Sequence, residues 1–550
     1  MATAAKASDA TATATHGVQH VDIAVVGAGF AGLYLLHRLR QAGFTAQGLE
    51  AGDDVGGTWY WNRYPGARCD IQTTDYSFTF DPALEAAWQW SEKYATQPEI
   101  LRYLGFVADR YDLRRDIRFG TRVTSARWNE ATGRWLLTTS AGPSVSCRCY
   151  VMASGCLSEP KPPEIDGVAD FAGEVYVTGR WPHEGVDFTG KRVAVIGTGS
   201  SGIQAIPVIA AQAAQLTVFQ RTPNFAFPAH NGPRPEHRVA PLVADLAAYR
   251  QQARLSLSGV PLPRATEFSW QLSEDERRRR FEEALAAGDL VVMLSQLWAD
   301  QGGDLAGNAL AADHLRGYIR SVVKDPATAE ALTPRDHPFG SKRPCLETNY
   351  YATFNKPNVG LVNLRQEPIE AITASGIRTA RRTVDVDAIV FATGFDAMTG
   401  AILAVHPITG RGGKSIDAVW AQGPQTYLGL TVAGFPNLFM ITGPGSPSVL
   451  ASMIQSIEQH VDWVVDCIGH MDDIGARTIE PLAAEEDAWV EHVNEVAQVS
   501  LRSTCSSWYV GANIPGKPRV FMPYIGGLPA YIQRCEAVVK NGYEGFALSS

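Results

Sequence analysis

Two sets of three glycines carry the clearest chemical signal in this sequence. Each set has the spacing G-x-G-x-x-G: Gly27, Gly29 and Gly32 in the first, then Gly197, Gly199 and Gly202 in the second. In this spacing the first glycine permits a tight turn, the second lets the backbone approach a pyrophosphate, and the third lets a helix pack closely against a strand. Free N–H groups at the helix N-terminus then bind the phosphates. We therefore predict that the chain binds two dinucleotides.

The first glycine set lies inside a complete strand, turn, helix and strand pattern. The apolar run 21–26 precedes the glycines as a buried strand, residues 33–39 follow as a helix, and a second strand over 45–49 leads to Glu50. A carboxylate at this spacing accepts hydrogen bonds from an adenosine ribose and repels a 2′-phosphate. The first site is therefore predicted to hold a dinucleotide without that phosphate.

The second glycine set repeats the pattern but ends on a base instead of an acid. A strand over 191–196 runs into the glycines, Ser200 lies within the set, and a strand over 216–219 leads to Arg221 and Thr222. A guanidinium beside a hydroxyl suits a 2′-phosphate through charge-assisted hydrogen bonds. The second set is therefore predicted to bind NADPH, which assigns FAD to the first.

Composition and charge exclude several classes of protein. At 550 residues the chain is long enough for two or three domains. Its net charge of −9 argues against a nucleic-acid or anionic-membrane partner. No stretch approaches the length of uninterrupted apolar sequence that spans a membrane.

The cysteines indicate neither a disulfide framework nor a metal site. There are eight of them, scattered along the chain, and none forms a C-x-x-C pair. A disulfide-reductase active site and the commonest zinc spacing are thereby disfavoured. We expect no metal and a cytoplasmic location, where thiols stay reduced.

These patterns predict an α/β fold with two Rossmann-like dinucleotide-binding domains and a helical insertion. The FAD-binding domain is expected in two parts, residues 1–159 and 391–550, with the NADPH-binding domain over 160–390 between them. Within the latter, the segment at about 226–336 breaks the alternation of strands and helices and is predicted to be largely helical. The apolar run 384–391 is predicted to be a strand, after which the chain crosses back between the domains.

Five further segments resemble a known family. They are G-G-T-W-Y-W-N-R-Y-P-G-A-R-C-D over 56–70, F-A-G-E-V-Y-V-T-G-R-W-P over 171–182, G-S-K-R over 340–343, G-P-G-S-P-S over 443–448 and S-W-Y-V-G-A-N-I-P-G over 507–516. Together they resemble the type I Baeyer-Villiger monooxygenases, which use FAD, NADPH and O2 to insert an oxygen atom beside a ketone carbonyl. The resemblance implies conversion of aryl, cyclic or steroid-like ketones to esters or lactones through a C4a-peroxide of the flavin, with sulfoxidation as a side activity.

The resemblance also implies roles for individual residues. Arg343 matches the family's active-site arginine, whose permanent positive charge stabilises a peroxide anion and then an oxyanion. Asp70 is the carboxylate expected to orient that guanidinium. Lys342 resembles a residue that helps to bind the 2′-phosphate of NADP. Trp508 resembles a tryptophan on a loop near 500–516 that closes over substrate and NADP.

The remaining expectations concern contacts and partners. The resemblance implies flavin contacts from Trp59 and Tyr76, and a ketone pocket lined by Ser446, Val449, Leu450 and Met453. The expected partners are a small-molecule ketone and O2. The chain is expected to act as a monomer or a weak homo-oligomer.

Val177 is the one departure from the family pattern, and it favours one of the two alternatives that stay open. It stands where the fingerprint F-x-G-x-x-x-H-x-x-x-W-P has histidine. This favours an N- or S-oxygenating flavin monooxygenase, although such an enzyme has no need for the pair of Arg343 and Asp70. The second alternative is a redox-responsive binding module, which would need neither that pair nor a closing tryptophan loop.

Reversion of Val177 tests what the departure costs. In the family the histidine orders the connection between the two nucleotide domains, and valine cannot supply its ring hydrogen bonds. We therefore expect Val177→His to speed flavin oxygenation or to lower the share of NADPH lost to hydrogen peroxide. Rapid-mixing oxygenation rates and peroxide yields measure both, and no change in either contradicts the hypothesis.

Overall fold

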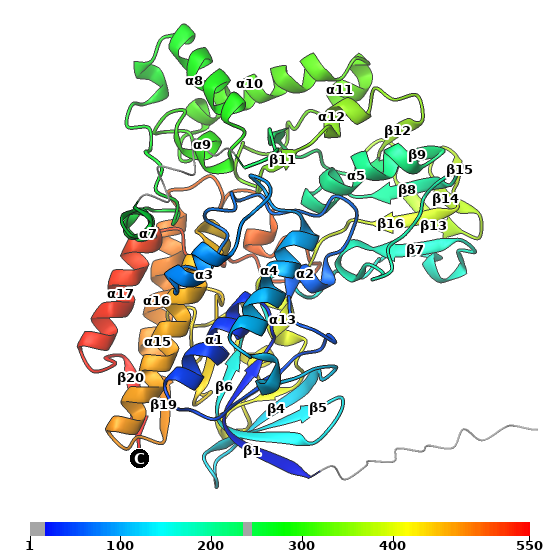
Figure 1. Cartoon of the computed structure of the whole chain (residues 1–550). Helices are drawn as coiled ribbons and strands as arrows, with labels where there is room; N and C mark the ends of the chain where they lie inside the picture. Colours follow the sequence, from blue (N-terminus) through cyan, green and yellow to red (C-terminus); the bar gives the residue numbers. More distant parts are fainter. Residues whose placement is uncertain (1–16, 235–244) are drawn as a thin grey trace, which may run out of the picture.

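The computed structural model describes residues 17–234 and 245–550, which form two separate large sheets with helices packed around them (Figure 1). The first sheet has the strand order β17-β4-β5-β6-β1-β2-β3, with β18 also paired to β6. Its strands come from both ends of the chain: β1 (Val18–Val26), β2 (Ala46–Leu49), β3 (Ile117–Arg118), β4 (Val123–Asn129), β5 (Arg134–Thr139), β6 (Ser144–Met152), β17 (Ile408–Thr409) and β18 (Leu438–Met440).

The second sheet is built from the middle of the chain. Its order is β12-β9-β8-β16-β7, and all four pairings are parallel. The strands are β7 (Glu174–Val177), β8 (Arg192–Ile196), β9 (Gln215–Gln220), β12 (Val359–Asn363) and β16 (Ala388–Phe391). Their buried, β-branched runs are typical of strands covered on both faces. The predicted α/β fold class is confirmed.

The predicted strand over 384–391 is wrong in its extent. The chain forms two strands there, β15 (Thr383–Asp385) and β16, which belong to different sheets. Between them Asp387 turns away to bind Arg192: its carboxylate accepts a hydrogen bond from the backbone N–H at 2.8 Å and pairs with the guanidinium at 2.7 Å. The sequence pattern conceals this change of direction because the two charged residues of the run, Asp385 and Asp387, stand between aliphatic ones.

The remaining strands of the described residues form three small sheets. The first has the order β13-β14-β15 and is antiparallel, the second pairs β10 with β11, and the third pairs β19 with β20. The strands not yet bounded are β10 (Ala226–Pro228), β11 (Cys345–Glu347), β13 (Ile369–Thr373), β14 (Gly376–Thr379), β19 (Thr478–Pro481) and β20 (Phe546–Ser549).

The helices fall into two groups along the chain. Those from its two ends pack around the first sheet: α1 (Phe30–Gln41), α2 (Thr58–Trp61), α3 (Pro82–Ala87), α4 (Gln97–Arg110), α13 (Gly400–Leu403), α14 (Ile416–Val419), α15 (Met453–Asp473), α16 (Ala483–Ala497) and α17 (Leu528–Lys540). Those from its middle are α5 (Ser200–Gln212), α7 (Leu246–Leu255), α8 (Glu274–Ala287), α9 (Leu290–Ser295), α10 (Leu305–Val322), α11 (Pro326–Leu332) and α12 (Tyr350–Thr353). None of the described helices combines the length and the apolar character that a membrane crossing requires.

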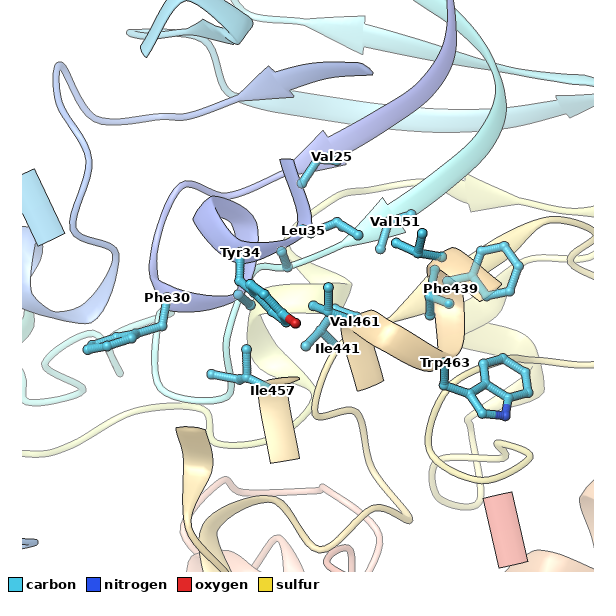
Figure 2. Close-up of a cluster of buried hydrophobic side chains, with 14 of the residues drawn as sticks. Val25, Phe30, Tyr34, Leu35, Val151, Phe439, Ile441, Ile457, Val461 and Trp463 are labelled. Atoms are coloured by element: carbon cyan, nitrogen blue, oxygen red, sulfur yellow. The ribbon is translucent and has the colours of Figure 1, made fainter. Parts of the chain in front are cut away.

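The core of the first unit lies between its sheet, α1 and α15 (Figure 2). The hydroxyl of Tyr34 on α1 donates to Asp462 on α15 at 2.8 Å, and Arg38 pairs with the same carboxylate. This packing places the N-terminus of α1 at the end of β1. The side chains in Figure 2 include Val25, Phe30, Tyr34, Leu35, Val151, Phe439, Ile441, Ile457, Val461 and Trp463.

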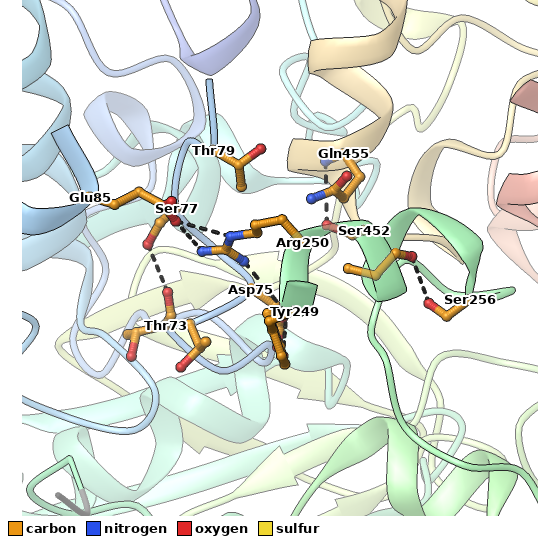
Figure 3. Close-up of polar contacts among 12 residues, drawn as sticks. Thr73, Asp75, Ser77, Thr79, Glu85, Tyr249, Arg250, Ser256, Ser452 and Gln455 are labelled. Carbon is orange, nitrogen blue, oxygen red and sulfur yellow. Dashed lines mark hydrogen bonds and ion pairs between the residues drawn. The ribbon is translucent and has the colours of Figure 1, made fainter. Parts of the chain in front are cut away.

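Helix α7 returns from the middle of the chain to the first unit through a buried ion pair (Figure 3). Nε of Arg250 donates to Glu85 at 3.0 Å, and the two side chains are only 14% and 8% exposed. The hydroxyl of Tyr249 donates to Asp75 at 2.8 Å beside them. Because removing one partner would leave an uncompensated buried charge, this pair holds the insert against the first unit.

Glu458 is a buried carboxylate on α15 that contacts Thr79. It accepts hydrogen bonds from the backbone N–H of Thr79 at 2.6 Å and from the Thr79 hydroxyl. Burial raises the pKa of Glu458 to about 7 even though these bonds and the charge of Arg254 lower it, and Asp462 adds to the rise. The folded protein therefore favours the protonated acid.

This raised pKa makes stability depend on pH in a known direction. Because the pKa of Glu458 lies above its unfolded value of 4.5, its contribution is complete below pH 4.5 and is lost as the pH rises to about 7. Glu458→Gln keeps the shape and stays neutral, so we expect it to gain up to about 3 kcal/mol over the parent by pH 8 and little at pH 5. Thermal unfolding of both proteins across this range measures the gap, and a gap that is constant with pH contradicts the expectation.

Candidate active site

A cavity of about 1000 Å³ runs between the first glycine turn, the middle of the chain and the C-terminal loops. Gly27, Gly29 and Glu50 line one end of it, and Ser200 lies on the side of the second unit. Arg343 lines the region between them. Residues more than 300 positions apart thus face one enclosed space.

The first glycine turn has the geometry that its spacing predicts. Gly27 has φ +104°, and a Cβ there would lie 2.6 Å from the carbonyl oxygen of Ala153. A Cβ on Gly32 would lie 1.9 Å from the Gly27 oxygen. A Cβ on Gly29 would lie 3.3 Å from the Cα of Gly57, and a Cβ on Gly57 would lie 2.8 Å from the Cα of Gly29. Only glycine fits these positions.

Glu50 lies at the end of β2, where its carboxylate is buried against the turn. Oε2 accepts from the N–H of Ala28 and Oε1 from the N–H of Gly52, each at 2.7 Å. Burial raises the pKa of Glu50, while these bonds oppose the rise. Each oxygen keeps a further lone pair for a ribose hydroxyl. Its part in ribose binding stays a prediction, but the structure adds a second task, which is to fasten the glycine turn to the sheet.

The second glycine turn has the same close packing at its first and third glycines, but more open space at its middle glycine. Gly197 has φ +110°, and a Cβ on Gly202 would lie 2.2 Å from the Gly197 oxygen. A Cβ on Gly199 would meet nothing within 4 Å, so the backbone there is open to a pyrophosphate. The Ser200 hydroxyl at the start of α5 lies 3.2 Å from the sulfur of Cys345.

The residues predicted to hold the 2′-phosphate lie beyond the cavity lining, near the protein surface. Arg221 is exposed and Lys342 is half-buried, and neither forms an ion pair with a described residue. The Thr222 hydroxyl accepts from Arg365 at 3.4 Å, and Arg365 also pairs with Asp336. Arg365 follows β12, the neighbour of β9 in the sheet, so pairing of strands rather than sequence spacing brings this third base to the site.

Arg343 and Asp70 form a bidentate ion pair on the cavity wall. Nε of Arg343 donates to one carboxylate oxygen at 2.7 Å and Nη2 to the other at 2.8 Å, while Nη1 donates to the carbonyl of Val449 at 3.2 Å. The side chains are 25% and 24% exposed. Burial lowers the pKa of Arg343, but the charge and hydrogen bonds of Asp70 outweigh it and leave the pKa above its ordinary value. The guanidinium is therefore a permanent charge facing the cavity.

The segment that carries Asp70 is docked on the second unit. The hydroxyl of Tyr64 donates to Gln204 of α5 at 2.8 Å, and the Gln204 amide donates to the carbonyl of Arg68 at 3.0 Å. A Cβ on Gly66 would lie 2.4 Å from the backbone oxygen of Gln204. Part of the segment 56–70 therefore serves to join the two units, with Asp70 at the junction.

Comparisons with known proteins agree with this geometry. Residues 24–257 match the family described as pyridine nucleotide-disulphide oxidoreductase. A Baeyer-Villiger monooxygenase of Pseudooceanicola batsensis is 40% identical over 95% of this chain and 95% of that protein. This chain belongs to the Baeyer-Villiger monooxygenases. The predicted family is confirmed.

Solved structures of relatives share the fold of this chain and were determined with bound cofactors. An oxidized steroid monooxygenase bound to NADP is 50% identical with a TM-score of 0.92, covering 96% of this chain and 100% of that one. OTEMO in complex with FAD and NADP is 40% identical, also with a TM-score of 0.92, over 96% and 99% of the two chains. The eight cysteines here are all buried and unpaired, so the match to disulphide oxidoreductases reflects a shared dinucleotide fold rather than disulfide chemistry.

The predicted flavin and lid aromatics line the same cavity. Nε1 of Trp59 donates to the hydroxyl of Tyr76 at 3.1 Å. The ring of Trp508 lies 4.2 Å from that of Tyr509 between centroids. Downstream, Asn513 donates to the carbonyl of Phe395 at 2.6 Å, which ties the loop to the segment that follows β16. Contacts of these aromatic rings with cofactors stay predictions.

Of the four residues predicted to line the ketone pocket, three line the cavity and one does not. Val449, Leu450 and Met453 line it. Ser446 is fully buried outside the lining, where its hydroxyl donates to the carbonyl of Gly443 at 2.7 Å. The tight turn at 443–446 folds this side chain back on its own backbone, and its contact with substrate stays a prediction.

Val177 also lies outside the cavity lining in this Baeyer-Villiger monooxygenase. It is the last residue of β7, opposite Phe391 of β16. Its side chain packs against the apolar cluster of that sheet. Its effect on flavin oxygenation stays a prediction.

Tyr509 and Arg502 are cavity residues for which spacing offered no signal. Both line the space beside Arg343, and the Nε of Arg502 donates to the carbonyl of Gly340 at 3.2 Å. Tyr509 stands next to Trp508 in a segment already singled out, so proximity in sequence could have suggested it. Arg502 is found only once the loop is folded.

Removal of the charge on Asp70 tests the ion pair. Asp70→Asn keeps the shape but leaves the buried guanidinium of Arg343 without a counter-charge, which we expect to cost on the order of 3 kcal/mol. Asp112→Asn, which breaks the exposed pair with Arg115, is the matched control and should change stability little. Denaturant unfolding of the three proteins gives the comparison, and equal losses in both variants would refute the role given to Asp70.

Proposed function

We propose that this protein converts ketones to esters or lactones with NADPH and O2, with FAD bound at the first glycine turn. The observation that carries the proposal is the paired guanidinium of Arg343 on a cavity that touches both dinucleotide turns. FAD, once reduced by NADPH, supplies the electrons that activate O2. The donors present suit both cofactors, because each turn has the close-packed glycines and the free helix N-terminus that a pyrophosphate needs.

Arg343 is the proposed catalytic residue. When the ketone carbonyl is attacked, negative charge builds on its oxygen, and preorganised positive charge in an enclosed site is usually the largest single catalytic contribution. The raised pKa of Arg343 means that it does not give up its proton to an anion beside it. Asp70 accepts from Nε and Nη2 and so positions the guanidinium, while Nη1 donates one hydrogen bond to the Val449 carbonyl and keeps a second N–H for an anion.

The preference for NADPH is proposed to come from Arg221, Lys342 and Thr222. The proximity of Arg365 to Thr222 supports this, since it adds a third base at the end of β9. We assign residues 160–390 to this nucleotide domain, with its helical insert at about 226–336, and residues 1–159 and 391–550 to the FAD domain. The separate sheets built from these segments support the division.

The loop near 500–516 is proposed to close over the substrate. Trp508 lines the cavity, and its neighbour Tyr509 packs on it, so a movement of this loop would change what encloses the site. Val449, Leu450 and Met453 give the ketone a largely apolar wall. We further propose a cytoplasmic monomer or weak homo-oligomer; the eight unpaired thiols support a reducing compartment.

N- or S-oxygenation remains the second candidate, on the single observation that Val177 replaces histidine. N- or S-oxygenation does not need a permanent positive charge at the active site, whereas this structure holds the Arg343 guanidinium in place with the carboxylate of Asp70. The geometry therefore favours oxygen insertion next to a carbonyl.

Product analysis of an Arg343 variant tests the proposal. The purified protein with FAD and NADPH should turn phenylacetone, cyclohexanone or a steroid ketone into an ester or lactone, identified by mass. Arg343→Ala should lower ester formation by about 100- to 1000-fold while flavin reduction by NADPH continues. Arg343→Lys is the matched variant that keeps the charge and loses the fork. NADPH consumption that yields only peroxide across the ketone panel would count against the function.

A further inference from the structure

One limb of the cavity carries two arginines that the proposed chemistry does not use. Its walls are α9, the loop 299–303 and the loop 499–502, together with Arg264 and Gly340. Backbone hydrogen bonds close these walls: the N–H of Ala265 donates to Ser295 at 2.9 Å, and that of Leu501 donates to Gly302 at 3.0 Å. We name this region the insert limb.

The carboxylates that line the cavity are all engaged elsewhere. Among the described lining residues they are Glu50, Asp70 and Glu159. Glu50 accepts from the first glycine turn, Asp70 is bound to Arg343, and Glu159 pairs with Arg180 at 3.0 Å. No carboxylate remains for the insert limb.

Arg264 and Arg502 therefore face this limb without a counter-charge. Within residues 17–234 and 245–550 neither forms an ion pair, and Arg502 has only the neutral Gly340 carbonyl as a side-chain acceptor. Burial lowers the pKa of Arg502; Tyr509 opposes the change, and the positive charges of Arg343 and Arg264 lower the pKa further. Arg343, Arg264 and Arg502 thus act on one another across a shared space, and of the three lining carboxylates only Asp70 pairs with one of them.

We propose that the insert limb binds an anionic group of the substrate, so that the preferred ketones carry a carboxylate. Arg502 would bind the carboxylate through a charge-assisted fork, with Arg264 at the exposed mouth of the limb. The ketone carbonyl would lie toward Arg343. This specificity rests on the proposed ketone oxidation, since it describes how the same cavity selects its substrate.

The phosphates of NADP are the competing anions, and the structure gives them other partners. The open backbone at Gly199 and the N-terminus of α5 serve the pyrophosphate. Arg221 and Thr222, proposed for the 2′-phosphate, lie outside the cavity lining altogether. Arg264 and Arg502 belong to the wall formed by the insert and the lid loop, together with apolar residues such as Leu294.

A pair of ketones of equal shape tests the proposal. They are 4-(2-oxopropyl)benzoate and 4-(2-oxopropyl)benzamide, with phenylacetone as the unsubstituted reference. The holoenzyme should favour the carboxylate over the amide by about tenfold or more in kcat/KM, mainly through KM. The preference should shrink at high salt, because screening weakens partly exposed charge interactions.

Variants of the two arginines locate the effect. Arg502→Gln should abolish the preference for the carboxylate over the amide, while Arg502→Lys should keep most of it. Arg264→Gln, at an exposed position, should reduce the preference and provides the test if Arg502→Gln does not fold. Arg127→Gln, an exposed arginine on β4 away from the cavity, is the matched control and should change nothing.

The possible outcomes distinguish a failure of the proposed carboxylate specificity from a failure of the proposed ketone oxidation. Equal kcat/KM for benzoate and benzamide overturns the proposal. An equal loss with all three ketones in Arg502→Gln, or a rise in the KM for NADPH that matches the rise for the carboxylate, assigns Arg502 to structure or to NADP and also overturns it. Failure of the parent enzyme to oxidise any ketone, phenylacetone included, instead refutes the proposed function itself.

Discussion

The site depends on keeping a permanent positive charge beside a largely enclosed cavity. Water would stabilise the Arg343 guanidinium better than protein does, so burial alone opposes it. Asp70 reverses this balance by accepting two hydrogen bonds in a bidentate geometry. The pair requires segments 273 positions apart in sequence to meet within hydrogen-bond distance. Much of the architecture can be understood as the means of bringing them there.

Each partner of the pair is held by a different part of the second unit. Tyr64 and Gly66 dock the Asp70 segment on Gln204 of α5. On the other side, the amide of Asn224 donates to the backbone carbonyl of Arg343 at 3.0 Å. Helix α5 also begins at the second glycine turn, so one helix orients a nucleotide site and supports the carboxylate of the ion pair. A displacement of α5 would therefore affect both.

Local patterns predicted the fold well where the physics is local. A glycine that must have positive φ or admit a neighbouring backbone, as at Gly27 and Gly202, leaves its mark in a short stretch of sequence. The strand over 384–391 was less well predicted, because the side-chain bond of Asp387 to Arg192 redirects the chain and no apolar pattern records it. Ser446 shows the same limit at the site: the family resemblance implied contact with substrate, but a turn directs the hydroxyl to the carbonyl of Gly443.

The sequence by itself determined the two dinucleotide turns, the change from Glu50 to Arg221 between them, and the family, because these depend on residues a few positions apart. Only the tertiary structure decided which charges lack partners. Whether Arg502 is paired depends on every acid that folding brings near it, and the lining acids are all bound elsewhere. Electrostatic interactions depend on distance in space and on burial, and neither is encoded by spacing along the chain.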